Sequence, residues 1–165
     1  MSTITYNEVY SSFFRKVEAY DLLREDLEEA QKTDLLHEWL IQAISDPYVR
    51  RLFSSLELVD DDEENDITDS VVYNMAESVN ESSDKLFTIE VLAYGVMIAW
   101  LSPKVNSLIN IVQFIGTADE KMFSQASHLQ QLRGLLEDVE NRQRKLIRDR
   151  GYIWNEYINS YGGGS

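Results

Sequence analysis

The sequence predicts an all-α fold, a helical bundle with a long C-terminal helix and an extended C-terminal tail. Residues 86–101 form an apolar run interrupted only by Thr88, Glu90 and Gly95, as expected for a helix buried on most sides. From 119 to about 150 nothing in the sequence stops a helix, and the flanking segments carry apolar residues on one side only. We expect one helical domain over 1–150 and an arm over 151–165.

Composition limits the possible functions. The chain has 165 residues, 44% of them hydrophobic, which suffices for one domain with a sizeable core. A formal net charge of −14 repels a phosphate backbone and disfavours tight DNA binding. The absence of cysteine excludes disulfides, cysteine-ligated zinc and thiol catalysis. The first residues lack a basic segment followed by an apolar run, so no signal peptide is expected.

The first helices are predicted by capping signals and apolar spacing. Thr5 and Glu8 form a capping-box pattern that starts a helix over 5–17. Leu22, Leu23 and Leu27 begin a second helical stretch, and a clearer apolar stripe predicts a helix over 34–45.

Asp46 and Pro47 mark the next helix start, because aspartate suits the N-cap and proline suits the first helical position. We expect a helix over 48–57 that buries Tyr48 and Leu56 and exposes the two arginines between them.

An acidic loop is expected near 58–70, where like charges repel one another. It is not an EF-hand, because the sixth position from Asp60 is not glycine and the twelfth is Val71. A solvated loop, a weak cation site and a partner-facing patch all remain open. Residues 67–79 fit either a strand, which would need a partner from this or a neighbouring subunit, or a helix.

The central helix is predicted over 85–101, capped by Ser83 or Asp84, and its apolar run is too short to span a bilayer. Glu90 within it is a costly group to bury, and a structural hydrogen bond explains it better than catalysis. Ser102 and Pro103 predict a turn into a helix over 104–115 that stops at Gly116.

A second capping box, Thr117 with Glu120, precedes a helix over 119–150, about 45 Å long. Two arrangements of this helix remain open: it packs along its whole length on the core of its own subunit, or its far half contacts another subunit. Its end is basic, which either complements the helix dipole or pairs with the acidic region of a neighbouring subunit. The subunit-interface candidates are Arg142, Arg144, Lys145 and Arg148.

The C-terminal arm is unusually aromatic for a free tail. Gly151 is expected to break the helix, and three alternatives remain open for the arm: it folds back on its own domain, inserts into a partner or is disordered. Its docking candidates are Tyr152, Ile153, Trp154, Tyr157, Ile158 and Tyr161.

No enzymatic motif is present: there is no P-loop, GxGxxG, GxSxG or HExxH pattern. His37 and His128 are far apart in the chain and fit ordinary surface or hydrogen-bonding roles. We expect no catalytic residue, no cofactor and no metal site.

Several segments of the sequence resemble those of a known protein family. The run Trp100 to Ser107, the residues Asn110, Gln113, Phe114 and Gly116, the stretch 120–129 and the opening Ile4 to Phe13 are similar to small helical head-to-tail connector (adaptor) proteins of tailed bacteriophages. The acidic middle segment and the aromatic tail are not part of this resemblance.

The resemblance implies a virion protein of the head-to-tail neck, assembled in the host cytoplasm. Such a protein forms a homo-oligomeric ring, a dodecamer, between the portal and a tail or stopper protein, and DNA passes through without being tightly bound. Acids at the lumen or its rim would repel the duplex; the candidates are Asp60, Asp61, Asp62, Glu63, Glu64 and Asp66. The alternative is a small acidic intracellular regulatory protein. Neither reading includes a membrane.

Overall fold

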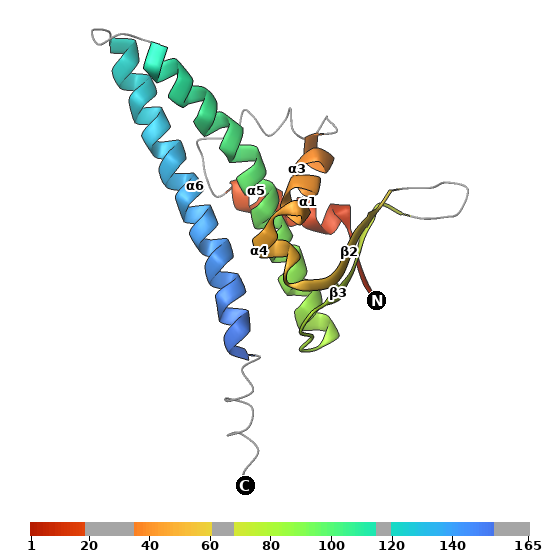
Figure 1. Ribbon diagram of the computed structural model, residues 1–165. Coiled ribbons are helices and arrows are strands. Elements are labelled where there is room, and N and C mark those ends of the chain that lie inside the picture. Colours follow the sequence, from red (N-terminus) through yellow and green to blue (C-terminus); the bar gives the residue numbers. More distant parts are fainter. Residues whose placement is uncertain (19–34, 61–67, 115–119, 154–165) are drawn as a thin grey trace.

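The computed structural model describes residues 1–18, 35–60, 68–114 and 120–153 (Figure 1). In this part of the chain the helices surround a central helix, α5, and a three-stranded antiparallel sheet lies on one side of it. The all-α prediction is therefore wrong, and the fold is mixed. The predictions for Leu22, Leu23 and Leu27, the Thr117 cap, Asp61 to Asp66 and the arm from Trp154 onward lie outside the described residues.

The sheet has the order β1–β3–β2 and consists of β1 (Ser2–Thr5), β2 (Phe53–Val59) and β3 (Ser70–Met75). Ile4 lies opposite Val71, and Leu56 lies opposite Tyr73. These side chains are buried in the core. Within 67–79, where strand and helix were both open, residues 70–75 form a strand, and both of its partner strands come from the same chain.

The predicted helix over 48–57 is wrong beyond its first turn. Asp46 caps α4 (Pro47–Arg50) by accepting a 2.7 Å hydrogen bond from the Tyr48 backbone N–H, as expected. The chain then enters β2, because pairing with the β-branched strand β3 outweighs an apolar spacing that suits a helix equally well. Tyr48, predicted to be buried, is 51% exposed.

Two other helices match the prediction. Helix α1 (Tyr6–Glu18) begins at the predicted capping box, in which the Thr5 N–H donates to Glu8 Oε2 at 2.9 Å and the Glu8 N–H donates to Thr5 Oγ1 at 3.3 Å. Helix α3 is Leu35–Ser45. Both pack against α5.

Helix α5 (Glu81–Phe114) replaces the two helices predicted over 85–101 and 104–115. Asn80, not Ser83 or Asp84, caps it by accepting from the Ser83 N–H at 2.9 Å. The helix continues through Pro103, and the Ser102 hydroxyl donates to the Ile98 carbonyl within it at 2.8 Å. Continued burial of Leu101 and Val105 offsets the proline cost of about 3 kcal/mol.

This longer helix also changes the membrane argument. By length and composition Glu81–Ile109 could cross a bilayer, contrary to the prediction that the apolar run is too short. However, 67% of its most apolar window is buried inside the protein, as in the core helix of a soluble protein.

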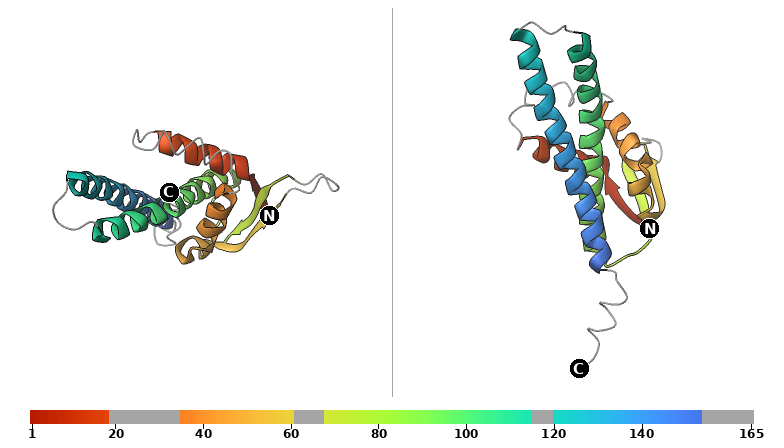
Figure 2. Two further views of the ribbon diagram at one scale, coloured as in Figure 1. Left: turned by 90° about the horizontal axis from the view of Figure 1, so that it is seen from above. Right: turned by 60° about the vertical axis from the view of Figure 1, so that its left-hand side comes forward.

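Helix α6 (Glu120–Ile153) runs antiparallel to α5 and packs along it (Figure 2). Both helices have 34 residues, so each is about 50 Å long. The Phe114 end of α5 and the Glu120 end of α6 extend beyond all the other elements (Figures 1 and 2). The prediction that Gly151 breaks the helix is wrong. Gly151 lies within α6, because a single glycine costs a helix only about 1 kcal/mol.

Gly95 allows α3 to approach α5 closely. A Cβ atom at this position would lie 2.7 Å from Ala43 Cβ. We expect Gly95→Ala to destabilise the fold by about 1–2 kcal/mol, because overpacking exceeds the gain in helix propensity. Gly134, where a Cβ meets nothing within 4 Å, is the matched control. Gly134→Ala should raise the free energy of unfolding in urea by about 0.5–1 kcal/mol, whereas a stabilising Gly95→Ala would contradict the close approach.

Candidate interaction surfaces

A buried ion pair joins the C-terminal end of α6 to the first turns of α5. The side chains of Asp84 and Arg150 are only 6% and 8% exposed, and Arg150 Nη2 donates to Asp84 Oδ1. The same nitrogen donates to the Glu77 carbonyl at 3.3 Å, and the Arg150 guanidinium lies 4.3 Å from the Phe87 ring centroid. The position of the α6 terminus is therefore defined by a charged contact within the subunit.

Both carboxylate oxygens of Asp84 accept further hydrogen bonds. Ser78 Oγ donates to Asp84 Oδ2 at 2.5 Å, and the Val79 N–H donates to Oδ1 at 3.1 Å. Burial alone would raise the pKa of Asp84, but these bonds and Arg150 outweigh it and lower the pKa. Sequence analysis missed this pair, because the two residues are 66 positions apart and Asp84 was considered only as a helix cap.

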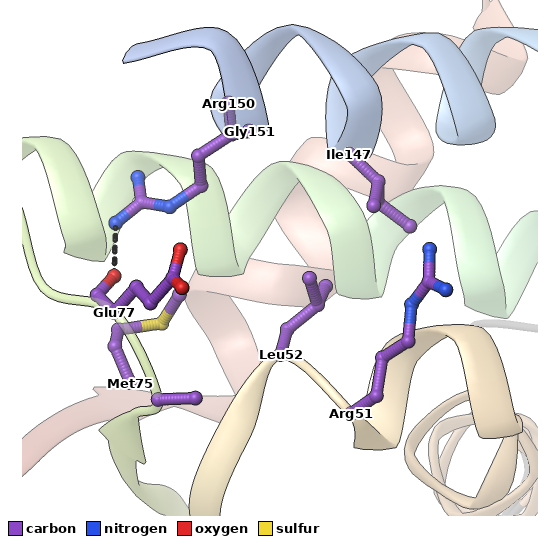
Figure 3. Close-up of a pocket in the computed structure, with 8 residues that line it drawn as sticks. Arg51, Leu52, Met75, Glu77, Ile147, Arg150 and Gly151 are labelled. Atoms are coloured by element: carbon purple, nitrogen blue, oxygen red, sulfur yellow. Dashed lines mark hydrogen bonds between the residues drawn. The ribbon is translucent and has the colours of Figure 1, made fainter. Parts of the chain in front are cut away.

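A cavity of about 230 Å³ lies beside this pair, between α6 and the segment that joins α4 to the sheet. Its apolar lining includes Leu52, Met75 and Ile147, and Arg51 and Arg150 enter it from opposite sides (Figure 3). The cavity combines apolar lining residues with two guanidinium groups.

The predicted subunit-interface residues are all exposed on α6 but differ in their contacts. Arg142 Nε donates to Asp138 at 2.8 Å, and Arg148 Nε lies 3.7 Å from Asp149. Arg144 instead lies over the ring of Tyr48 on α4, 5.6 Å from its centroid. Arg51 lies over the same ring at 5.0 Å. Sequence analysis did not connect Tyr48 with this basic helix end.

Of the predicted lumen or rim acids, the structure describes Asp60. It accepts a 3.1 Å hydrogen bond from the Tyr6 hydroxyl, and His37 Nε2 lies 3.8 Å from its carboxylate. Burial and this hydrogen bond raise the pKa of Tyr6. Asp60 thus anchors the end of β2, and the remaining acids, Asp61 to Asp66, follow it outside the described residues.

Ion pairs fasten α1 to α5. Glu90 accepts from Ser12 Oγ at 2.7 Å and from Lys16 Nζ at 2.5 Å, which confirms its structural hydrogen-bonding role. Burial raises the pKa of Glu90, but the Lys16 and Ser12 bonds outweigh it and lower the pKa. One turn toward the N-terminus, Lys85 Nζ lies 2.7 Å from Glu8, and this hydrogen bond lowers the pKa of Glu8.

These three carboxylates predict an acid-sensitive fold. Because the pKa values of Glu8, Asp84 and Glu90 are lower in the folded protein, the stability they add is complete above the unfolded values, about 4, and is lost as pH falls through the folded values. The urea midpoint should stay nearly constant from about pH 7 to 5 and fall below about pH 4. Glu90→Gln should make that fall shallower, whereas the exposed control Glu137→Gln should not. An unchanged acid dependence in Glu90→Gln would contradict the role of this pair.

Helix α6 ends beside a groove of mixed apolar and polar lining. The backbone of Tyr152 and Ile153 completes the last turn of α6, so the arm begins after these residues and not at Gly151. Asp149 and Arg150 line a groove of about 530 Å³ together with three apolar residues, Leu86, Phe87 and Leu146, and four polar ones, Asn80, Ser82, Ser83 and Glu90. Leu86, also in the groove, is 63% exposed, although it begins the otherwise buried apolar run of the central helix.

Among the described residues, no group of three or more histidine, cysteine, aspartate or glutamate side chains is placed to hold a metal ion. No family model, curated protein or solved structure matches the chain.

Proposed function

We propose that this chain is a structural virion protein of a tailed phage, a subunit of a ring-shaped head-to-tail adaptor beneath the portal. The observation that carries the proposal is the α5–α6 hairpin, about 50 Å long, whose outer end extends beyond the other elements (Figure 1). A compact single domain has no need of such a projection, whereas a ring subunit uses it to reach its neighbours.

The charge of the chain supports the same function. The inner surface of a channel through which DNA passes should repel phosphate, and a chain with a net charge of −14 can supply an acidic surface. We place some of the acids among Asp60 to Asp66, in the β2–β3 connection, or neighbouring acids at the lumen or its rim. The passing duplex then stays hydrated and is not held.

The arm supplies the attachment to the portal. The buried Asp84–Arg150 pair holds the end of α6, so every copy in a ring presents residues 154–161 from the same place. Trp154, Tyr157 and Tyr161 offer aromatic area, which contributes strongly to binding when buried. Repetition around a ring raises the effective concentration of individually weak arms.

Removal of the arm should separate folding from attachment. We expect a chain ending at Ile153 to keep its helical circular dichroism and melt within a few degrees of the parent, because no described core residue is lost. Binding to the purified portal of the same virus, measured by biolayer interferometry, should be lost. A full-length variant with Trp154, Tyr157 and Tyr161 changed to serine should lose binding in the same way, which controls for chain length.

Two outcomes would contradict the portal-docking arm. A truncated protein that unfolds would place the arm in the subunit's own core. A truncated protein that binds the portal like the parent would place the attachment elsewhere.

A further inference from the structure

Helices α4 and α6 bring Tyr48, Arg51 and Arg144 together on one exposed surface. The guanidinium carbons of Arg51 and Arg144 lie 5.0 and 5.6 Å from the centroid of the Tyr48 ring, which is itself 51% exposed. We propose that this arginine–tyrosine cluster is the docking surface for the acidic segment Asp60–Asp66 of a second copy of this chain. Its role in closing a ring rests on the proposed function.

The cluster differs from the other arginines at this end of α6. Arg142, Arg148 and Arg150 each have a carboxylate within the subunit. Arg51 and Arg144 have none among residues 1–18, 35–60, 68–114 and 120–153; their cationic charges contact only the ring of Tyr48. In a chain with 29 acidic and 15 basic residues, two neighbouring arginines without an acidic partner in the described part of the chain are available to an acidic partner from outside.

Contact with Tyr48 also prepares the arginines for binding. Each guanidinium is positioned over an aromatic face, so less side-chain entropy is lost when a carboxylate docks. Arginine forks pair with carboxylates through two parallel hydrogen bonds, and tyrosine and arginine are enriched among residues that dominate interface energies. Arg51 also borders the 230 Å³ cavity, whose apolar lining residues can take an apolar side chain next to the carboxylates (Figure 3).

Charge and position identify the occupant. Asp60–Asp66 contains six carboxylates in seven residues, and Ile67 follows it directly. The Val59 and Ser70 ends of the β2–β3 pair point away from α6, on the opposite side of α5 (Figures 1 and 2). The acidic segment and the cluster therefore suit a contact between two copies. Because the two surfaces differ, the contact is head-to-tail, the type that generates a ring when the rotation between copies closes.

Charge exchange tests the proposal with the full chain. The first variant carries Arg51→Glu and Arg144→Glu, and the second carries Asp61→Lys, Asp62→Lys and Glu63→Lys. At low ionic strength the parent protein should self-associate in sedimentation velocity. Each variant alone should associate at least ~10-fold more weakly, and an equimolar mixture should regain association, because each variant then meets a complementary surface.

The matched control places the same charge change on the same helix. Arg142→Glu with Arg148→Glu alters arginines that already have carboxylate partners, so self-association should change less than ~2-fold. Association of the parent should also weaken steeply as salt is added.

Any of three results would overturn the inference. The parent protein stays monomeric at every concentration at low ionic strength, or the Arg51→Glu/Arg144→Glu variant associates as strongly as the parent protein. In the third, the arginine–tyrosine cluster of the parent protein binds duplex DNA in a gel-shift assay.

The proposed function can fail independently of this inference. A parent that self-associates through the cluster but binds no portal contradicts the adaptor function alone. Normal rings on the portal formed by Arg51→Glu/Arg144→Glu contradict this inference alone.

Discussion

Arg150→Met should lower the free energy of unfolding by about 3–5 kcal/mol. The variant leaves the carboxylate of Asp84 buried, 6% exposed, without its cationic partner. Adding Asp84→Asn to Arg150→Met removes the uncompensated charge and should recover a large part of the loss. Urea denaturation followed by circular dichroism measures all three proteins.

Arg148→Met is the control for this prediction. Arg148 is two residues away on the same helix, its side chain is 63% exposed, and its pair with Asp149 has a separation of 3.7 Å. Its replacement should change stability by less than about 0.5 kcal/mol. Equal effects of Arg150→Met and Arg148→Met would show that the buried pair does not fasten α6 to α5.

Trp100→Ala should cost about 3–5 kcal/mol, because it empties a core position on the central helix. Trp100 is 4% exposed, and its ring meets Phe13 of α1 edge-on at 5.7 Å and Trp39 of α3 at 6.4 Å. Three helices therefore lose contact at once. Thermal melting checks the result.

Leu35→Ala provides the comparison, since Leu35 is 40% exposed at the start of α3. It should melt within a few degrees of the parent. A Trp100→Ala protein that melted like the parent would show that the aromatic cluster is not the centre of the core.

Local signals in the sequence predicted local structure well. The Thr5–Glu8 box and the Asp46–Pro47 cap act over three residues or fewer, and both form the expected hydrogen bonds. The apolar stripes of α1 and α3 likewise predicted helices that pack on α5. In each case the residues that decide the structure are neighbours in the chain.

The sheet could not be predicted in the same way. β1 has four residues and overlaps a helix-capping signal, and Ile4 becomes a strand residue only because Val71 lies opposite it. β2 has apolar positions that fit a helix equally well until its pairing with β3 is known. Strand formation here depends on partners that are distant in sequence.

The helix breakers in the sequence were misleading without the fold, and the contacts of its charged residues could not be assigned from the sequence. Pro103 and Gly151 both lie inside long helices, because packing along α5 and α6 outweighs the local cost. The basic end of α6 suggested a subunit interface, but the sequence does not show that its cations differ: Arg150 completes a buried pair with Asp84, whereas the exposed Arg144 contacts the ring of Tyr48. Which cations are already neutralised depends on contacts between distant elements.

The proposed adaptor function is tested most directly by the mass of the complex formed when this protein is mixed with the purified portal of the virus that encodes it. Native mass spectrometry should show several copies of this chain on each portal, with a single copy number that matches a closed ring. A protein that remains monomeric and adds no mass to the portal would contradict the adaptor function and favour a small acidic regulatory protein.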